Sequence, residues 1–170
     1  MGVRVRAPSV AAFFVLGLTI VAPGVAETFS GSATLTGTLK LGVARCGTQR
    51  QELSAALVVA PDGTWTAGDA ETSFAGTSTP VGRSGRKIRL ALDEASSAAL
   101  VASIEGDVAT FCELSSITVT SSRPKALTLA LNRTLTKAKL VVKYVFKGTA
   151  DGRPGTARYV LTGRGPWTPA

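Results

Sequence analysis

Two cysteines, eleven carboxylates and one serine–lysine motif are the residues of this chain that could do chemistry. The sequence contains no histidine, which excludes nucleophilic catalysis by a Ser–His or Cys–His arrangement. A glycosidase would need two carboxylates that converge across a cleft. The close pairs do not meet this need, because Asp93 is expected to cap a helix and the others fall in loops or at a helix end. These pairs are Asp69/Glu71, Asp93/Glu94 and Glu105/Asp107.

The segment Ser84-Gly85-Arg86-Lys87 matches the S-x-x-K pattern of serine acyl enzymes. That chemistry needs the serine and the lysine on a helix, together with S-D-N and K-T-G partner motifs. Here the four residues form a glycine-flanked turn, and the chain lacks both partner motifs. Glycine-rich phosphate loops of the Walker type are also missing from the sequence. We therefore predict no catalytic residue, no cofactor and a protein that is not an enzyme.

Cys46 and Cys112 are the only cysteines of the chain. In an oxidising compartment a lone pair of cysteines is most simply one disulfide, and this one would close a loop of 66 residues. Metal binding is the alternative, but two thiolates without histidine do not complete a zinc site. We predict a structural disulfide between them and no metal site.

The N-terminus indicates export. Arg4 and Arg6 precede an apolar run over residues 10–22, and Gly24-Val25-Ala26 then places small residues at a cleavage site before Glu27. The apolar run is shorter than the roughly 20 residues that a transmembrane helix needs. We therefore predict a signal peptide over residues 1–26 and one secreted or periplasmic domain over residues 27–170, with no transmembrane anchor in the mature chain.

Alternation of apolar and polar residues indicates strands along most of the mature chain. The run over residues 53–60 is apolar at successive positions and predicts a strand buried on both faces. Pro61-Asp62-Gly63 and Asp151-Gly152 are turn sequences, the second of them in a hairpin. The strand-like stretches are residues 33–43, 53–60, 64–66, 72–80, 87–92, 117–120, 126–131, 138–146 and 156–162.

One segment between the strands has the pattern of a helix. Asp93 is a candidate N-cap, and the following residues to Ile104 are rich in alanine, leucine and serine. Gly106 and Asp107 weaken helix formation, so a break is expected there. The predicted buried stripe consists of Leu100, Ile104, Val108 and Phe111.

About eight short strands with one inserted helix predict a mainly β domain, either an antiparallel barrel-like sheet or a sandwich. The barrel-like sheet is preferred, with the helix covering an open end or face, because small residues at inward positions suit tight curvature. Cys112 follows the helical segment and would attach it to the end of the first strand.

Gly63-Thr64-Trp65 resembles the G-x-W signature of lipocalin-like secreted barrels. The family pattern places this signature near the start of the first strand, whereas here it lies well into the mature chain. The resemblance implies a barrel with a cavity for a small apolar ligand. Packing of Trp65 in the core is the other interpretation.

Basic residues gather in the last third of the chain. Residues 27–120 carry seven lysines and arginines against ten aspartates and glutamates, a net charge of −3. Residues 121–170 carry ten against Asp151 alone, a net charge of +9. Side chains alternate between the two faces of a strand, so one face of the last two strands is predicted to be basic. The candidate anion-binding residues on it are Lys137, Lys139, Lys143, Lys147, Arg158 and Arg164.

This basic face indicates an anionic partner: an acidic polysaccharide, lipopolysaccharide or another anionic surface. Nucleic acid is not expected, because the basic face lacks interleaved aromatic residues for base stacking. A solvated outer face, on which lysines discourage aggregation, is the simpler interpretation. Three hypotheses remain open: an exported binding or interaction domain, a lipocalin-like carrier of a small apolar ligand, and a structural envelope protein.

Overall fold

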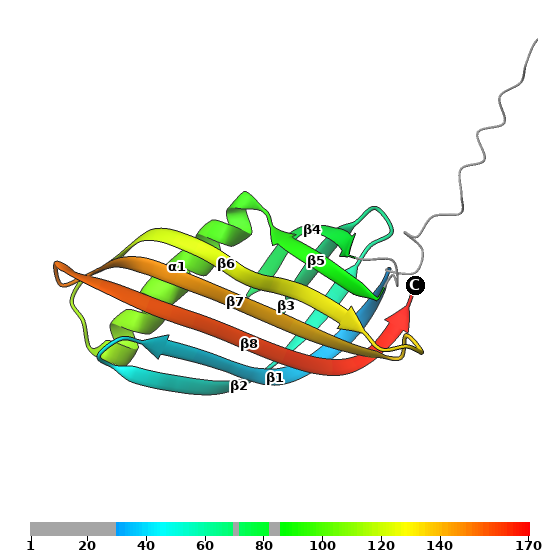
Figure 1. Cartoon of the computed structure of the whole chain (residues 1–170), viewed down its shortest axis with the longest axis horizontal. Coiled ribbons are helices and arrows are strands. Elements are labelled where there is room, and N and C mark those ends of the chain that lie inside the picture. The colour runs from blue at the N-terminus through cyan, green and yellow to red at the C-terminus, as the bar shows by residue number, and fades with distance from the viewer. Residues whose placement is uncertain (1–29, 70–71, 82–85) are drawn as a thin grey trace, which may run out of the picture.

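The computed structural model describes residues 30–69, 72–81 and 86–170. The predicted signal peptide, and Ser84 and Gly85 of the S-x-x-K motif, lie outside the described residues. Eight strands form one closed antiparallel barrel, in which each strand pairs with the next and β8 pairs back with β1 (Figure 1). The barrel was preferred to a sandwich, and the structure confirms it. The elements are β1 (Gly31–Val43), β2 (Gly47–Val59), β3 (Thr64–Gly68), β4 (Ser73–Val81), β5 (Lys87–Leu92), α1 (Glu94–Cys112), β6 (Ile117–Leu131), β7 (Lys137–Ala150) and β8 (Arg153–Pro169).

The strands have very unequal lengths. β1, β2, β6, β7 and β8 each contain 13 to 17 residues, whereas β3, β4 and β5 contain five to nine. The expected short strands are therefore found on only one side of the barrel. The long strands extend beyond the short ones, and α1 packs against the inner face of this extension (Figure 1). The helix thus covers an open face of the sheet, as predicted.

Two apolar clusters follow from this arrangement. Where all eight strands are present, alternate residues point inward and fill the barrel around Trp65, Leu129 and Trp167. Under the helix, Leu100, Ile104 and Val108 of α1 pack against inward residues of the long strands. These strand residues are Leu41, Tyr144, Phe146, Ala157 and Tyr159.

Helix α1 begins where it was predicted and ends later. The Asp93 side chain accepts a hydrogen bond of 2.7 Å from the Ser96 amide, so Asp93 is the N-cap. The expected break at Gly106 and Asp107 is wrong, because the helix runs on to Cys112. Both residues face solvent, while Ile104 and Val108 on either side of them are buried; this burial outweighs the helix penalty of about 1 kcal/mol for a glycine. Phe111, expected in the buried stripe, is only half-buried.

Two strand predictions also need correction. Residues 53–60 were expected to be buried on both faces, but Leu57 and Val59 point inward while Val58 is 47% exposed. Its face of β2 forms part of the outer wall of the barrel, where apolar side chains meet water. Residues 117–120 and 126–131 belong to one strand, β6, which has irregular pairing at Val119/Ser121 and Pro124/Ala126. A bulge accommodates a proline, which cannot donate to the strand ladder.

The two predicted turns are present. At the β2–β3 turn, the Asp62 carboxylate accepts hydrogen bonds from the Thr64 amide (2.9 Å) and hydroxyl (2.7 Å), and these bonds lower the pKa of Asp62. Gly63 adopts a φ of 85° there, which glycine tolerates without strain. Asp151 and Gly152 make the β7–β8 hairpin turn with φ values of 46° and 73°, as the primed hairpin turns require.

The disulfide between Cys46 and Cys112 is present, with the two Cα atoms 5.5 Å apart. It joins the β1–β2 turn to the last residue of α1. A second attachment lies at the other side of the helix, where Glu105 Oε1 accepts a hydrogen bond of 2.7 Å from the Val119 amide of β6. The C-terminal half of the helix is therefore held to both borders of the opening that it covers.

We predict that replacing Cys46 and Cys112 together by serine lowers the free energy of unfolding by roughly 4 kcal/mol, since the closed loop is long. Urea unfolding of the oxidised protein and of the variant measures this difference. Under reducing conditions the two proteins should unfold at the same urea concentration. An unchanged midpoint in the oxidised protein would show that the bridge contributes no stability.

Candidate functional site

The outer face of β7 and β8 carries all six residues selected from the sequence. Lys139 and Arg164 lie directly opposite each other, and Arg158 lies opposite Val145, so their side chains share the outward face. All six are exposed, whereas Tyr144 and Phe146 at alternating positions are buried. The structure therefore brings the predicted residues together on one sheet surface.

Barrel closure adds cations that the chain places far away in sequence. Val160 of β8 lies beside Lys143 of β7 on one side and Lys40 of β1 on the other. Lys40 in turn lies opposite Arg50 of β2. On the other side of β7, strand β6 lies between β7 and β5. Ala130 of β6 lies opposite both Lys139 and Lys87, and Thr128 lies opposite both Val141 and Arg89, so each set forms one row of side chains across the strands. We call this surface the basic wall; its cations are Lys40, Arg50, Lys87, Arg89, Arg123, Lys137, Lys139, Lys143, Lys147, Arg158 and Arg164.

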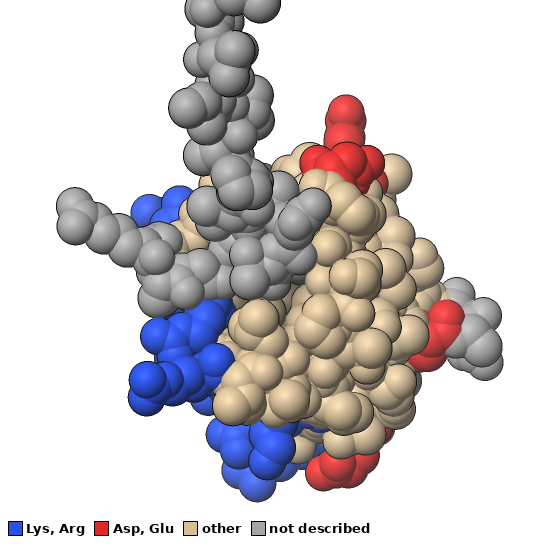
Figure 2. Space-filling model, turned by 90° about the vertical axis from the view of Figure 1, so that its right-hand side faces the viewer, with Lys and Arg blue, Asp and Glu red and all other residues tan. Residues whose placement is uncertain are grey.

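The charges of the two signs occupy different sides of the barrel. Viewed end-on, lysines and arginines gather along the left and lower left, and aspartates and glutamates lie at the upper right, right and lower right (Figure 2). Glu52 is the one carboxylate in the strand rows that make up the basic wall among the described residues, and the Thr38 hydroxyl donates to it over 3.4 Å. The wall offers no aromatic side chain, because Tyr144 and Tyr159 point inward.

A groove lies at one end of the basic wall. It has a volume of about 620 Å³ and is lined by Lys137, Lys139 and Arg164 on a floor that includes Ala130 and Gly165. The β6–β7 turn borders the groove and is held rigidly, since the Asn132 carboxamide accepts hydrogen bonds from the amides of Thr136 (2.8 Å) and Lys137 (2.9 Å). Three cations on a floor of small residues could hold an anionic group.

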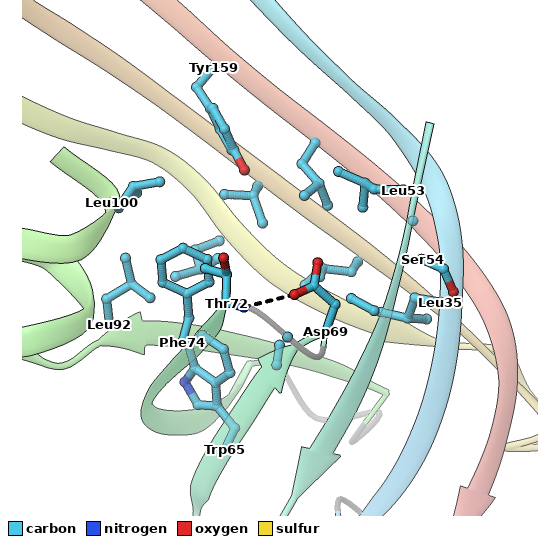
Figure 3. Close-up of a pocket in the computed structure, with 18 residues that line it drawn as sticks. Leu35, Leu53, Ser54, Trp65, Asp69, Thr72, Phe74, Leu92, Leu100 and Tyr159 are labelled. Carbon is cyan, nitrogen blue, oxygen red and sulfur yellow. Dashed lines mark hydrogen bonds between the residues drawn. The ribbon is translucent and has the colours of Figure 1, made fainter. Parts of the chain in front are cut away.

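An apolar cavity of about 150 Å³ lies inside the barrel, between the two core clusters. Strands, helix and the β3–β4 turn all contribute to its lining (Figure 3). Gly163 leaves room in its wall, where β8 crosses Gly37 of β1. The labelled lining residues are Leu35, Leu53, Ser54, Trp65, Asp69, Thr72, Phe74, Leu92, Leu100 and Tyr159.

Tyr159 supplies a polar group to this cavity. Its side chain is 9% exposed, its hydroxyl points into the cavity (Figure 3), and that hydroxyl makes no hydrogen bond to any residue in the described part of the chain. Burial, with a smaller contribution from the negative charge of Asp107, raises the pKa of Tyr159 from 10.0 to about 12. The hydroxyl is therefore a neutral donor in neutral solution.

The tryptophan of the G-x-W segment is a packing residue. Trp65 is 4% exposed, and its indole nitrogen donates to the carbonyls of Thr77 (3.0 Å) and Ala91 (3.1 Å). It also forms part of the cavity wall. Trp65 lies at the start of β3 rather than in the first strand, so the structure shares an eight-stranded antiparallel barrel with lipocalin-like proteins without sharing the position of their signature.

Among the described residues, three of the carboxylates considered for catalysis accept hydrogen bonds from backbone amides. Asp93 caps α1, Glu105 holds the Val119 amide, and Asp69 accepts from the Thr72 amide over 2.8 Å. Glu71 lies outside the described residues. Within residues 30–69, 72–81 and 86–170, no three His, Cys, Asp or Glu side chains gather as metal ligands, and no helix is long and apolar enough to cross a membrane.

Comparison with known proteins leaves the family open: no protein-family model matches the chain, and no curated protein is significantly similar to it.

Sequence reasoning missed the contribution of β1, β2, β5 and β6 to the basic wall. Lys40, Arg50, Lys87 and Arg89 belong to the part of the chain whose net charge is negative, so a count by segment conceals them. The alternation of polar and apolar residues could have found three of them, because Lys40, Lys87 and Arg89 alternate with apolar residues as the cations of β7 do; Arg50 lies between two glutamines and carries no such signal. Only the closing pair β1–β8 shows that the faces are continuous.

We predict that the protein loses stability between about pH 10 and 12, because Tyr159 ionises more readily in the unfolded chain than in the folded one. Below pH 10 the raised pKa of Tyr159 leaves the free energy of unfolding unchanged. Above pH 10 it lowers this free energy progressively, by on the order of 2–3 kcal/mol in total. In Tyr159→Phe this fall should be smaller, although burial also raises the pKa of Tyr144. Urea unfolding across this pH range measures it; equal alkaline losses in both proteins would contradict the assignment.

Proposed function

We propose that the protein is an exported, non-enzymatic binding domain whose basic wall engages an extended acidic polysaccharide. The observation that carries this proposal is the closure of the barrel, which joins cations from four further strands, β1, β2, β5 and β6, to those of β7 and β8 in one surface. A surface with eleven lysines and arginines and a single carboxylate creates a strong positive potential.

The dimensions of the wall favour a linear partner. Lys137 and Lys147 mark its ends along β7 and are separated by ten residue steps, or roughly 33 Å of strand. Successive outward residues of one strand lie about 7 Å apart. A flexible chain with regularly spaced anionic groups can follow such a surface over its whole length.

The curvature and composition of the wall argue for a carbohydrate chain. A convex barrel presents only a narrow strip to a flat membrane, whereas a flexible chain can bend around it. Without outward aromatic side chains the wall has nothing on which nucleic-acid bases could stack. Sulfates, phosphates and carboxylates of a polysaccharide need only cations, and the groove at Lys137, Lys139 and Arg164 offers a place for one such group.

Export and a binding role support each other. The predicted signal peptide and the disulfide are typical of an oxidising compartment, where acidic polysaccharides and lipopolysaccharide are found. The chain has no histidine, and three of its carboxylates, those of Asp62, Asp93 and Asp151, accept hydrogen bonds from backbone amides at a cap or a turn. These features agree with a protein that binds a partner outside the cytoplasm.

We predict that replacing Lys40, Lys139 and Lys143 together by glutamine weakens binding to a heparin oligosaccharide at least about tenfold. Each lost charge contact contributes about 0.5 kcal/mol, and 1.4 kcal/mol corresponds to a factor of ten. Because all three side chains are exposed, stability should change by less than about 1 kcal/mol. Titration at two salt concentrations measures the affinity, which should fall with salt in the parent.

The matched control replaces Arg45, Arg133 and Arg153 by glutamine, which removes the same net charge from hairpin ends instead of the wall. This control should bind almost as tightly as the parent. Equal losses in the two variants would show a response to net charge alone and refute a specific surface. Binding to lipopolysaccharide or to anionic phospholipid vesicles, without binding to heparin, would replace the polysaccharide by one of those partners.

The cavity supports a second candidate function, that of a carrier for a small apolar ligand. Its volume of about 150 Å³ is below the 300–1,000 Å³ of ordinary ligand pockets but equals that of an apolar cavity that binds benzene. The Tyr159 hydroxyl would donate a hydrogen bond to an acceptor on the ligand. This role agrees with the barrel architecture that lipocalin-like proteins use.

We predict that benzene or phenol raises the thermal unfolding temperature of the parent in a concentration-dependent way, since ligands that bind only the folded state stabilise it. Ala67→Leu, which fills the cavity, should abolish this shift. The same substitution at Ala56, on the outer face of β2, is the control and should preserve it. If neither compound shifts the transition of the parent, the cavity has no carrier role for ligands of this class.

A further inference from the structure

The strand β2 has a long free edge. It pairs with β1 over its full length, Gly47 to Val59, but with β3 only from Ala56 to Val59. Within the described part of the chain, residues 47–55 therefore have a strand on one side only, and Figure 1 shows β2 along the lower border of the molecule. The opening arises because β3 has only five residues. Helix α1 lies beside β4, β5 and β6, and its last residue, Cys112, is bonded to Cys46 at the start of this edge.

Residues 47–52 are exposed on both faces of the strand, whereas Leu53 and Ala55 are half-buried. Gln49 and Gln51 have inward parity yet are exposed, and Arg50 and Glu52 are exposed on the outward face. The backbone groups on the open side belong to alternate residues. The Ala60 amide donates to the Thr64 carbonyl of β3 over 2.8 Å. Because the backbone groups of every second residue in a strand point to the same side, the amides and carbonyls of Ser54, Glu52, Arg50 and Thr48 also point to the side of β3.

Edges of this kind are usually protected against pairing. Proteins place lysine, proline or a bulge on such strands, or cover them. Residues 47–55 contain no lysine and no proline, and their register with β1 is continuous. The only charges are Arg50 and Glu52, two positions apart on one face.

We infer that this edge pairs with the same edge of a second copy of the chain, antiparallel and about a two-fold axis at Gln51. In this register Arg50 of each copy lies opposite Glu52 of the other, so two opposite-charge pairs form on the outer face. Thr48 lies opposite Ser54, and Gln49 opposite Leu53. A two-fold interface must be self-complementary, and the charge order along β2 satisfies this condition.

The backbone geometry fits the same register. In an antiparallel ladder, directly opposed residues that hydrogen-bond exchange both bonds. Arg50 and Glu52 are both among the residues whose amides and carbonyls point outward, as are Thr48 and Ser54. Gln51 bonds toward β1 and falls at a non-hydrogen-bonded position on the axis. Shifting the register by two residues would lose both charge pairs.

The test uses the purified, oxidised chain and charge reversal. Sedimentation velocity over a concentration series should show a reversible dimer for the parent. Arg50→Glu and Glu52→Arg should each weaken it at least about tenfold, because two attractive pairs become repulsive. An equimolar mixture of the two variants should form a heterodimer, and the double variant should recover the homodimer. Arg158→Glu, with the same charge change on β8 opposite Gly42 and Val145, is the control and should dimerise like the parent.

A second measurement reads the register directly. Amide hydrogen exchange should slow on dimerisation at Thr48, Arg50, Glu52 and Ser54, while Gln49 and Gln51 keep the exchange rates that pairing with β1 imposes. Circular dichroism checks that each variant is folded. A parent that stays monomeric up to about 1 mM, a weak-affinity limit, would overturn the inference. So would a dimer that ignores both charge reversals, or a monomer that binds an unrelated extended peptide at this edge.

Discussion

Pairing between the first and the last strand is the interaction on which the rest of the structure depends. Eleven residues of β1 pair with β8, from Gly31 opposite Pro169 to Val43 opposite Ala157. This pairing satisfies the backbone groups of two strands that would otherwise be edges, and it closes the core. It also makes the outer faces of the N-terminal and C-terminal strands one continuous wall. The charge pattern of this surface therefore depends on the pairing of β1 with β8.

A shortage of strand residues explains the other features. β3, β4 and β5 are too short to face the full length of β2 and β6, and a helix occupies part of the missing wall. The Cys46–Cys112 bridge and the Glu105–Val119 hydrogen bond hold that helix in place. The cavity and the free edge of β2 both lie where the substitution of helix for strand is incomplete. The short lengths of β3, β4 and β5 thus account for both the cavity inside the barrel and the free strand edge on its outside.

Local signals were sufficient to predict most elements of the fold. Asp93, Asp62 and Asp151 use side-chain or backbone chemistry that acts within a few residues, so their cap and turns follow from the sequence. The disulfide could be predicted because the chain has only two cysteines and is expected to be exported to an oxidising compartment. The prediction that residues 53–60 are buried on both faces was wrong. Val58 and Leu57 are both apolar, and only the tertiary structure of the barrel determines which of them is exposed to solvent. The continuation of α1 past Gly106 likewise depends on packing of Ile104 and Val108 against distant strands.

The candidate site shows the same division. Parity placed Lys139, Lys143 and Arg164 on one face, because the period of a strand is a local property. Nothing local could place Lys40 beside Val160, or reveal that β2 lacks a partner over residues 47–55, since both depend on the lengths of other strands.

The basic wall and the β2 edge are connected through Arg50. Its row contains Lys143, Val160 and Lys40 and ends at the free edge, so pairing of two copies would join their walls across the two-fold axis. The partner's Glu52 would then interrupt the positive row at the junction and reduce the repulsion between the two walls. Salt should affect the two surfaces differently. It screens the attraction between the wall and a polyanion, whereas at the junction it screens both the Arg50–Glu52 attraction and the repulsion between two net-positive chains. Dimer formation should therefore depend less on ionic strength than polyanion binding does, because backbone hydrogen bonds provide most of its contacts.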